Sequence, residues 1–219
     1  MKGRSGVSMI KDSYYIVEID YRTAMDVVVK NHYLHRKCPC SHAFGLFEYA
    51  TDKLVGVVVY GVSCSSTLLK GICGEDEMHN VYELNRLWVS DEVPKNGESF
   101  LIANTIKLLD KEIIVSFADS SQHHVGYVYQ ATNFLYCGLS AKFRDPKVRG
   151  LENQHHATYA HGMTTRQVVE KYGAENVYYV DRPRKYRYVY FNCNKRRKKE
   201  LMAKLKYKVL PYPKNGEIN

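Results

Sequence analysis

The sequence predicts an α/β fold in which a mixed central sheet is flanked by helices. Strand-like and helix-like segments alternate along the chain as far as residue 143, which is typical of such folds. A length of 219 residues with 45% hydrophobic composition allows one sizeable core. Because no internal repeat or long linker divides the chain, we expect residues 1–219 to form a single domain.

The first part of the chain predicts a strand, a helix and a hairpin. Residues 13–20 alternate between apolar and polar side chains, as in a half-buried strand. Residues 23–32 begin with a Thr-x-x-Asp capping pattern, so we expect a helix that begins at Thr23. Residues 42–50 and 53–63 flank a Thr-Asp turn, and the second of them is apolar enough to be a central strand.

The next part predicts a long strand, a loop, and then helices and strands in alternation. Apolar periodicity distinguishes the strands from the helices. The expected elements are a strand at 82–90, a loop at 91–99, a helix at 99–110, a strand at 112–119, a short helix at 126–133 and a strand at 134–143.

This order of elements resembles the acyl-CoA N-acyltransferase (GNAT) fold. In that fold the loop after the long central strand and the following helix N-terminus bind the pyrophosphate of the cofactor through backbone N–H groups. The resemblance implies acetyl-CoA as cofactor, held by Asn96, Gly97 and Ser99, with Arg86 on the strand as a phosphate ligand. The loop departs from the usual fingerprint, since it has one glycine and places Glu98 beside it.

Basic residues are concentrated near the C-terminus. Residues 182–214 carry thirteen Lys or Arg and one acid, a net charge of +12 within a total of +9, so the remaining residues sum to −3. Such a basic extension with interleaved tyrosines favours a nucleic-acid partner. Two alternatives stay open: residues 184–191 as a half-buried strand, and the following helix as a solvated basic surface. The predicted DNA contacts are Arg184, Lys185, Arg187, Lys195, Arg196, Arg197 and Lys198.

Targeting signals are not expected in this sequence. No stretch approaches the roughly 18 to 20 apolar residues that a membrane-spanning helix needs, and residues 1–15 lack the apolar core of a signal peptide. We therefore expect a cytoplasmic protein without a membrane partner. Its six cysteines would then stay reduced.

The run NHYLHRKCPCSH at residues 31–42 concentrates histidines and cysteines. A Cys₂His₂ zinc site would use His35, Cys38, Cys40 and His42, but the Cys-x-Cys gap is shorter than the usual spacing and no second pair follows. A second alternative is that the histidines cap helix carbonyls through their ring N–H groups. The run alone leaves both alternatives open.

Candidate catalytic residues lie at strand ends. Asp119 ends the 112–119 strand, where a carboxylate can accept a proton or bind a metal, or alternatively cap the next helix. Strand alternation predicts that Glu83 and Asn85 share one face of the 82–90 strand and that Arg86 points the other way.

Longer strings, including HYLHR, ELNRLWV and SFADSSQHHVGYVYQATNF, resemble the Mom family of bacteriophage DNA-modification proteins. The resemblance implies transfer of a carbamoylmethyl group to the exocyclic amine of adenine in DNA, which protects phage DNA from restriction in the host cytoplasm. It implies Asp119, Tyr129, Tyr33 and Glu83 as catalytic residues, and iron held by His32, His35 and Asp119.

The expected partners are double-stranded or locally flipped DNA and a small-molecule acyl donor, and a homodimer is compatible with the sequence. Two other functions compete with the Mom-like one: an acyl-CoA N-acyltransferase that acts on another amine, and a non-enzymatic protein that masks DNA by occupancy.

Overall fold

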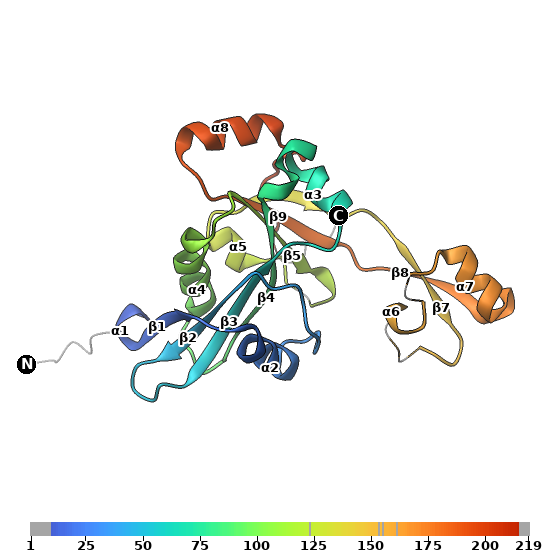
Figure 1. Cartoon of the computed structure of the whole chain (residues 1–219), viewed down its shortest axis with the longest axis horizontal. Helices are drawn as coiled ribbons and strands as arrows, with labels where there is room; N and C mark the ends of the chain where they lie inside the picture. Colours follow the sequence, from blue (N-terminus) through green and yellow to red (C-terminus); the bar gives the residue numbers. More distant parts are fainter. Residues whose placement is uncertain (1–9, 123, 153, 155, 161, 215–219) are drawn as a thin grey trace, which may run out of the picture.

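A seven-stranded sheet forms the body of the protein (Figure 1). The computed structural model describes residues 10–122, 124–152, 154, 156–160 and 162–214. The strand order is β1-β2-β3-β4-β5-β9-β6. The strands are β1 (Tyr14–Glu18), β2 (His42–Glu48), β3 (Leu54–Gly61), β4 (Val81–Val89), β5 (Ile113–Asp119), β6 (Leu135–Leu139) and β9 (Lys185–Phe191). The predicted mixed sheet flanked by helices is therefore confirmed.

One strand pair in this sheet is parallel. β1 to β4 pair in antiparallel order, as the hairpin pattern predicts, whereas β4 and β5 run side by side in the same direction. β9 inserts between β5 and β6 and is antiparallel to both. Tyr186, Tyr188 and Phe191 on β9 are buried, so residues 185–191 form the partly buried strand of the alternative interpretation.

Helices cover both faces of the sheet. α4 buries Leu101 and Ile102 in the core on one face, together with Tyr60 of β3. α2 packs on the opposite face against Val57 and Val59, because successive β3 side chains point to opposite faces. The body's helices and 3₁₀ turns are α1 (Ile10–Ser13), α2 (Tyr21–Asn31), α3 (Ser66–Cys73), η1 (Glu75–Asn80), α4 (Gly97–Thr105), η2 (Ile106–Leu108), η3 (Ser120–Gln122), α5 (Tyr127–Ala131) and α8 (Lys195–Lys204).

The start of α2 differs from the sequence prediction. Asp20 is the N-cap, and its carboxylate accepts hydrogen bonds from the Thr23 backbone N–H at 3.0 Å and the Thr23 hydroxyl at 2.6 Å. The Thr-x-x-Asp pattern thus named the wrong cap, since Asp20 provides the same acceptor three residues earlier.

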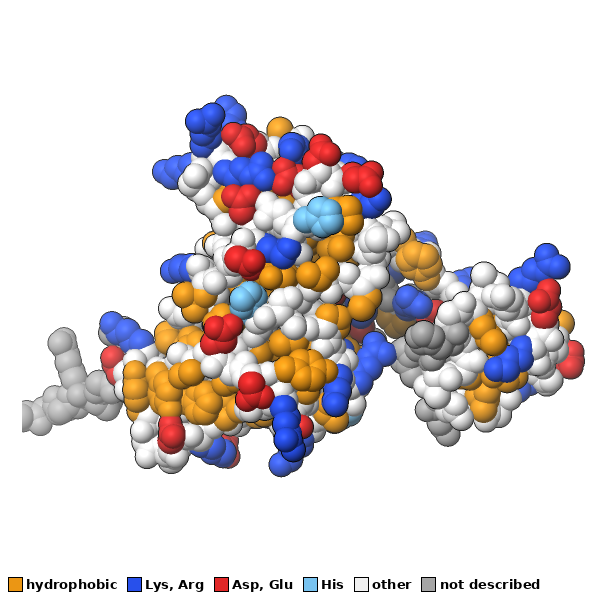
Figure 2. Space-filling model, viewed as in Figure 1, with side chains coloured by type: hydrophobic (Ala, Val, Ile, Leu, Met, Phe, Trp, Pro, Cys, Tyr) orange, Lys and Arg blue, Asp and Glu red, His pale blue; other side chains and the backbone are white. Residues whose placement is uncertain are grey.

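Residues 141–183, hereafter the arm, leave the body as a separate lobe (Figures 1 and 2). The arm contains β7 (Arg144–Val148), α6 (His156–Tyr159), α7 (Thr165–Tyr172), η4 (Ala174–Asn176) and β8 (Val177–Asp181). Its own small core contains Val148, Tyr159, Ala160 and Val168. No helix or strand was predicted from the sequence for residues 144–181. Among the described residues, no helix is both long and apolar enough to cross a membrane.

Candidate functional site

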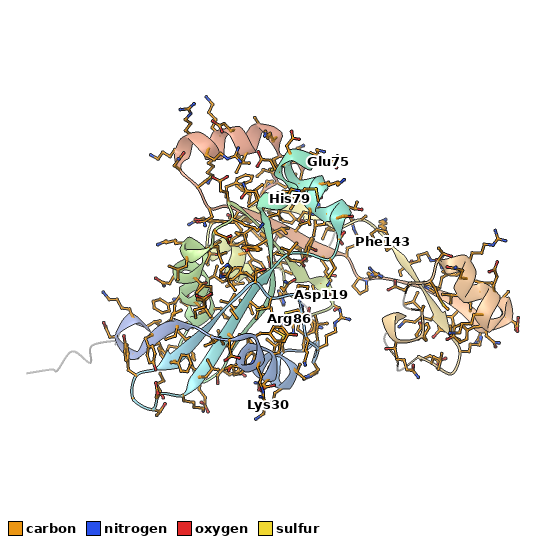
Figure 3. All side chains as sticks on the ribbon, in the orientation of Figure 1. Lys30, Glu75, His79, Arg86, Asp119 and Phe143 are labelled. Carbon is orange, nitrogen blue, oxygen red and sulfur yellow. The ribbon has the colours of Figure 1, made fainter. Side chains whose placement is uncertain are left out.

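A cavity opens where the two parallel strands separate. β4 and β5 pair only from Val81 to Glu83 and from Ile113 to Val115. Beyond this point β5 no longer pairs with β4, although it continues along β9 as far as Asp119. The cavity between them has a volume of about 450 Å³ and is lined by the C-terminal end of α2, by β4, β5 and α5, by Glu98 of α4 and by Lys185 of β9. Figure 3 labels Arg86 and Asp119 in this part of the molecule.

Predicted residues from distant parts of the sequence meet in this cavity. Its lining includes His32, Tyr33, Glu83, Arg86, Asp119, Tyr129 and Lys185. The sequence predicted Lys185 as a DNA contact and Glu98 as an unfavourable neighbour of Gly97 in the cofactor loop, and it gave no role to His124; all three line the cavity. Lys185 faces Asp119 because the two residues are register partners on β9 and β5.

The Asp119 carboxylate is held in an ionised state. Its Oδ1 accepts hydrogen bonds from the Ser121 backbone N–H at 3.0 Å and the Ser121 hydroxyl at 2.7 Å, and Lys185 Nζ lies 3.6 Å from Oδ2. Burial by itself raises the pKa of Asp119, but these hydrogen bonds and the lysine charge lower it below the ordinary value. The bonds to Ser121 also match the alternative in which Asp119 caps the next helical turn.

Two tyrosines in the cavity keep their protons at neutral pH. Burial, the Asp119 charge and a hydrogen bond to Asp119 raise the pKa of Tyr33. Burial raises the pKa of Tyr129 to about 12, and a hydrogen bond with Ser116 offsets part of this effect. Tyr129 is packed against Tyr188 and Phe134, whose ring centroids lie 5.2 and 5.4 Å away. Both hydroxyls are therefore hydrogen-bond donors at the cavity.

β4 departs from regular alternation at the cavity. The register of β3 and β4 shifts by one residue, so that Tyr60 faces Leu84 and Val59 faces Arg86, with Asn85 as the extra residue. Such a bulge rotates the following side chains. The prediction that Arg86 points away from Glu83 is therefore wrong, and both line the cavity.

Arg86 has an unused hydrogen-bond donor. One terminal nitrogen, Nη1, donates to the Asn85 carbonyl at 2.6 Å. Within the described part of the chain, the buried Nε of Arg86 has no partner. Burial also lowers the pKa of Arg86. A buried charged donor without a partner is costly, which is typical of a group that binds an anionic ligand.

The predicted cofactor loop lies beside this cavity. Asn96 precedes α4 with a left-handed φ of 76°, and a Cβ on Gly97 would lie 2.6 Å from a methyl carbon of Val93. The Ser99 hydroxyl donates to the Asn96 carbonyl at 3.0 Å. Of the loop and first turn, Glu98 reaches the cavity. Of the four predicted cofactor residues, Arg86 lines the cavity, whereas Asn96, Gly97 and Ser99 are not among its lining residues. The Glu98 carboxylate would oppose a phosphate group there.

The predicted iron ligands do not converge. His32 Nδ1 accepts the Leu34 backbone N–H at 3.2 Å, which places the proton of a neutral ring on Nε2, and burial together with nearby cations lowers the pKa of His32 to about 4. His35 has a φ of 44° and turns its Nδ1 to the Val29 carbonyl at 3.0 Å, as in the capping alternative. In the described ranges, no three His, Cys, Asp or Glu residues are placed to hold a metal ion.

The two cysteines near these histidines give no support to a zinc site. Cys38 is buried, and burial raises the pKa of its thiol to about 11. Zinc binds the thiolate form, which this environment disfavours. Cys38 packs with Ala24, Val28 and Val57 and so acts as a small core residue.

Several predicted DNA contacts have partners within the protein. The Arg187 guanidinium lies 3.9 Å from the centroid of the Tyr207 ring, and Arg184 Nε donates to the Ser140 carbonyl at 2.7 Å. Arg197 forms ion pairs with Glu77 at 2.6 Å and Glu112 at 2.8 Å. Lys195, Arg196 and Lys198 are exposed on α8.

A family model and a sequence relative both relate the chain to the Mom protein family. The model of the Mom protein family matches residues 13–214. The methylcarbamoylase mom of Escherichia phage Mu is 30% identical over 205 residues, which cover 85% of this chain and 74% of the phage protein.

Solved acetyltransferase structures are also similar to this chain. A Bacillus subtilis acetyltransferase in complex with CoA is 14% identical with a TM-score of 0.41, over 82% of this chain and 97% of that chain. A spermidine/spermine N-acetyltransferase from Vibrio cholerae is 8% identical with a TM-score of 0.48, over 84% and 95% of the two chains.

Proposed function

Because the chain belongs to the Mom protein family and is a transferase, we propose that it transfers a carbamoylmethyl group to the exocyclic amine of adenine in DNA. The modification would protect the DNA from restriction enzymes. The observation that carries this proposal is the convergence of Asp119, Tyr33, Tyr129 and Arg86 on one cavity beside the α4 N-terminus.

We propose that the cavity accepts an acyl-CoA as cofactor together with the base. Arg86 would bind its negatively charged part through the unused Nε, and the first backbone N–H groups of α4 would add further donors. We propose no role for iron, because His35 is not among the residues that line the cavity and because, in the described ranges, no three His, Cys, Asp or Glu residues are placed to hold a metal ion.

The acidic and phenolic groups provide for proton movement. Asp119 is ionised, so its carboxylate can accept a hydrogen bond from the adenine amine and orient it. Tyr129 keeps its proton and can donate it from Oη, while Tyr33 donates to Asp119 and holds that carboxylate in place. Adenine's amine is paired inside a duplex, so the base must be flipped into the cavity at a cost of a few kcal/mol.

The test is nucleoside analysis of cellular DNA. The protein and its Asp119→Ala variant are expressed in a bacterium, and the DNA is digested and analysed by mass spectrometry. We expect a carbamoylmethyl adenosine derivative with the wild type and unmodified adenosine with the variant. An unchanged nucleoside profile from folded wild-type protein would favour another amine substrate or a non-enzymatic masking role.

A further inference from the structure

The arm begins and ends beside the cavity. Lys185 lines the cavity, and its backbone N–H bonds the Ser140 hydroxyl at 2.9 Å, while Arg184 Nε bonds the Ser140 carbonyl. The two chain segments that enter and leave the arm are joined again by the Arg182 N–H, which donates to the Phe143 carbonyl at 2.8 Å. Figure 3 labels Phe143 between the body and the arm. The two ends of the arm are thus held together beside the cavity.

The two faces of the arm's sheet differ in character. Val148 pairs with Val177 and packs with Tyr159 and Val168 of the helices, so this face is covered. Side chains alternate along a strand, and directly paired residues share a face. Lys147, its partner Tyr178 and Arg149 therefore lie on the other face, hereafter the open face. Asp145, Val180, Phe143 and Arg182 continue it toward the neck.

The open face combines cations with flat rings. The Arg149 guanidinium carbon lies 5.7 Å from the Tyr178 ring centroid, and that of Arg182 lies 5.8 Å from the Phe143 ring. The carboxylate on this face, Asp145, is paired with Arg182 at 2.9 Å. Among the described residues, Lys147 and Arg149 have no ion pair with a carboxylate within 4 Å. Backbone hydrogen bonds and, to a lesser extent, the Arg149 charge lower the pKa of Glu152. Neither cation is neutralised by a close carboxylate, so both can attract an anionic partner.

The distance between the cavity and the open face is compatible with one helical turn of DNA. Arg149 is nine residues beyond Ser140, so an extended chain at about 3.3 Å per residue places it no more than roughly 30 Å from the rim of the cavity. One helical turn of DNA is about 34 Å long. Phosphates within one turn of a base in the cavity are consequently within reach of the open face.

We propose that the open face of the arm binds the phosphate backbone of the DNA that flanks the modified base. The proposal rests on the proposed function and locates the contact that holds the substrate. Lys147 and Arg149 bind phosphates, and the rings of Tyr178 and Phe143 keep the guanidinium groups in position. The open face is a different surface from α8. Lys185 begins the seven-residue strand β9, and α8 follows the other end of that strand, about 20 Å away.

The test uses the full chain with Lys147→Gln and Arg149→Gln combined. Binding to a 20-base-pair duplex is measured at several salt concentrations. Two lost phosphate contacts should reduce the slope of log K against log salt by about 1.8 and weaken binding on the order of tenfold at 0.1 M salt.

The matched control removes two charges from the covered side of the same arm, with Arg166→Gln and Lys171→Gln on α7. We expect this control to bind with the wild-type slope. An open-face variant with the wild-type affinity and slope would overturn the proposal, and a loss confined to changes in α8 would move the contact there. Wild-type protein that binds no DNA would contradict the proposed function itself. If the wild type modifies adenosine and the open-face variant binds DNA as the wild type does, the role of the arm alone would be overturned.

Discussion

Arg86 and Arg197 are both partly buried arginines, but they differ in their surroundings. Arg197 joins α8 to the rest of the body through Glu77 and Glu112, and Lys204 adds a second pair to Glu77 at 2.6 Å. Arg86 instead faces the cavity with an unpartnered Nε. Arg197, with its several carboxylate partners, stabilises the fold, whereas Arg86, which lacks such partners and lines a cavity, is positioned to bind a ligand.

The largest expected effects are on catalysis. Asp119→Ala and Tyr129→Phe should each lower the rate of modification by about 10² to 10⁴, because each removes a group that would orient or transfer a proton. The melting temperature of Tyr129→Phe should stay near the wild-type value. Ser116, which loses Tyr129 as a hydrogen-bond partner, still donates to the Leu84 carbonyl. Tyr136→Phe is the control, because Tyr136 is not among the residues that line the cavity. Full activity of Tyr129→Phe would remove Tyr129 as the acid.

Arg197→Met should cost about 2–4 kcal/mol of unfolding free energy, because Glu77, with 8% of its side chain exposed, loses a principal partner. Urea denaturation measures this loss, and modification below the transition should be unaffected. Arg196→Met on the same helix, where 93% of the side chain is exposed, should change stability by less than about 0.5 kcal/mol. Equal stability of the two variants would contradict the structural role of Arg197.

Arg86→Met should show the opposite pattern. We expect unchanged or slightly higher stability, since a buried donor without a partner is removed. The apparent affinity for acyl-CoA should fall about 10- to 100-fold, the equivalent of one charge-assisted hydrogen bond. Isothermal titration with CoA measures the change. Unaltered CoA affinity would require another ligand for Arg86.

A smaller effect concerns pH. Burial and nearby cations lower the pKa of His32 to about 4, so the unfolded chain binds the proton more strongly than the folded one. Stability is therefore retained above pH 6.5 and falls progressively toward pH 4, by about 2 kcal/mol at pH 5. His32→Gln should flatten urea stability between pH 7 and 5. A wild-type curve that is already flat there would show that His32 is not held neutral.

The sequence predicted the order of elements in the body because apolar periodicity is a local property. It also predicted that His32, Tyr33, Asp119 and Tyr129 belong to one site. The bulge at Asn85 was not predictable, because it depends on the register that β3 imposes on β4. Likewise, the Asp119–Lys185 pair depends on β9, which enters the sheet 66 residues after β5 has ended.

The charge pattern of the C-terminal segment did not predict which of its cations form ion pairs within the protein. The run at 195–199 predicts a basic surface, but Glu77 and Glu112, which engage Arg197, are remote in the sequence. The arm was missed because its strands are short and their pairing spans about 30 residues. Its open face is recognisable only after β7 and β8 are paired.

The most direct test compares Arg86→Met with Arg197→Met in one assay. Both variants and the wild type are incubated with DNA and acyl-CoA at a temperature where all are folded, and the nucleosides are quantified by mass spectrometry. The account predicts modified adenosine with the wild type and Arg197→Met, and at most about a tenth of that amount with Arg86→Met. Wild-type levels of modification by Arg86→Met would contradict the assignment of Arg86 as the residue that binds the cofactor in the cavity between β4 and β5.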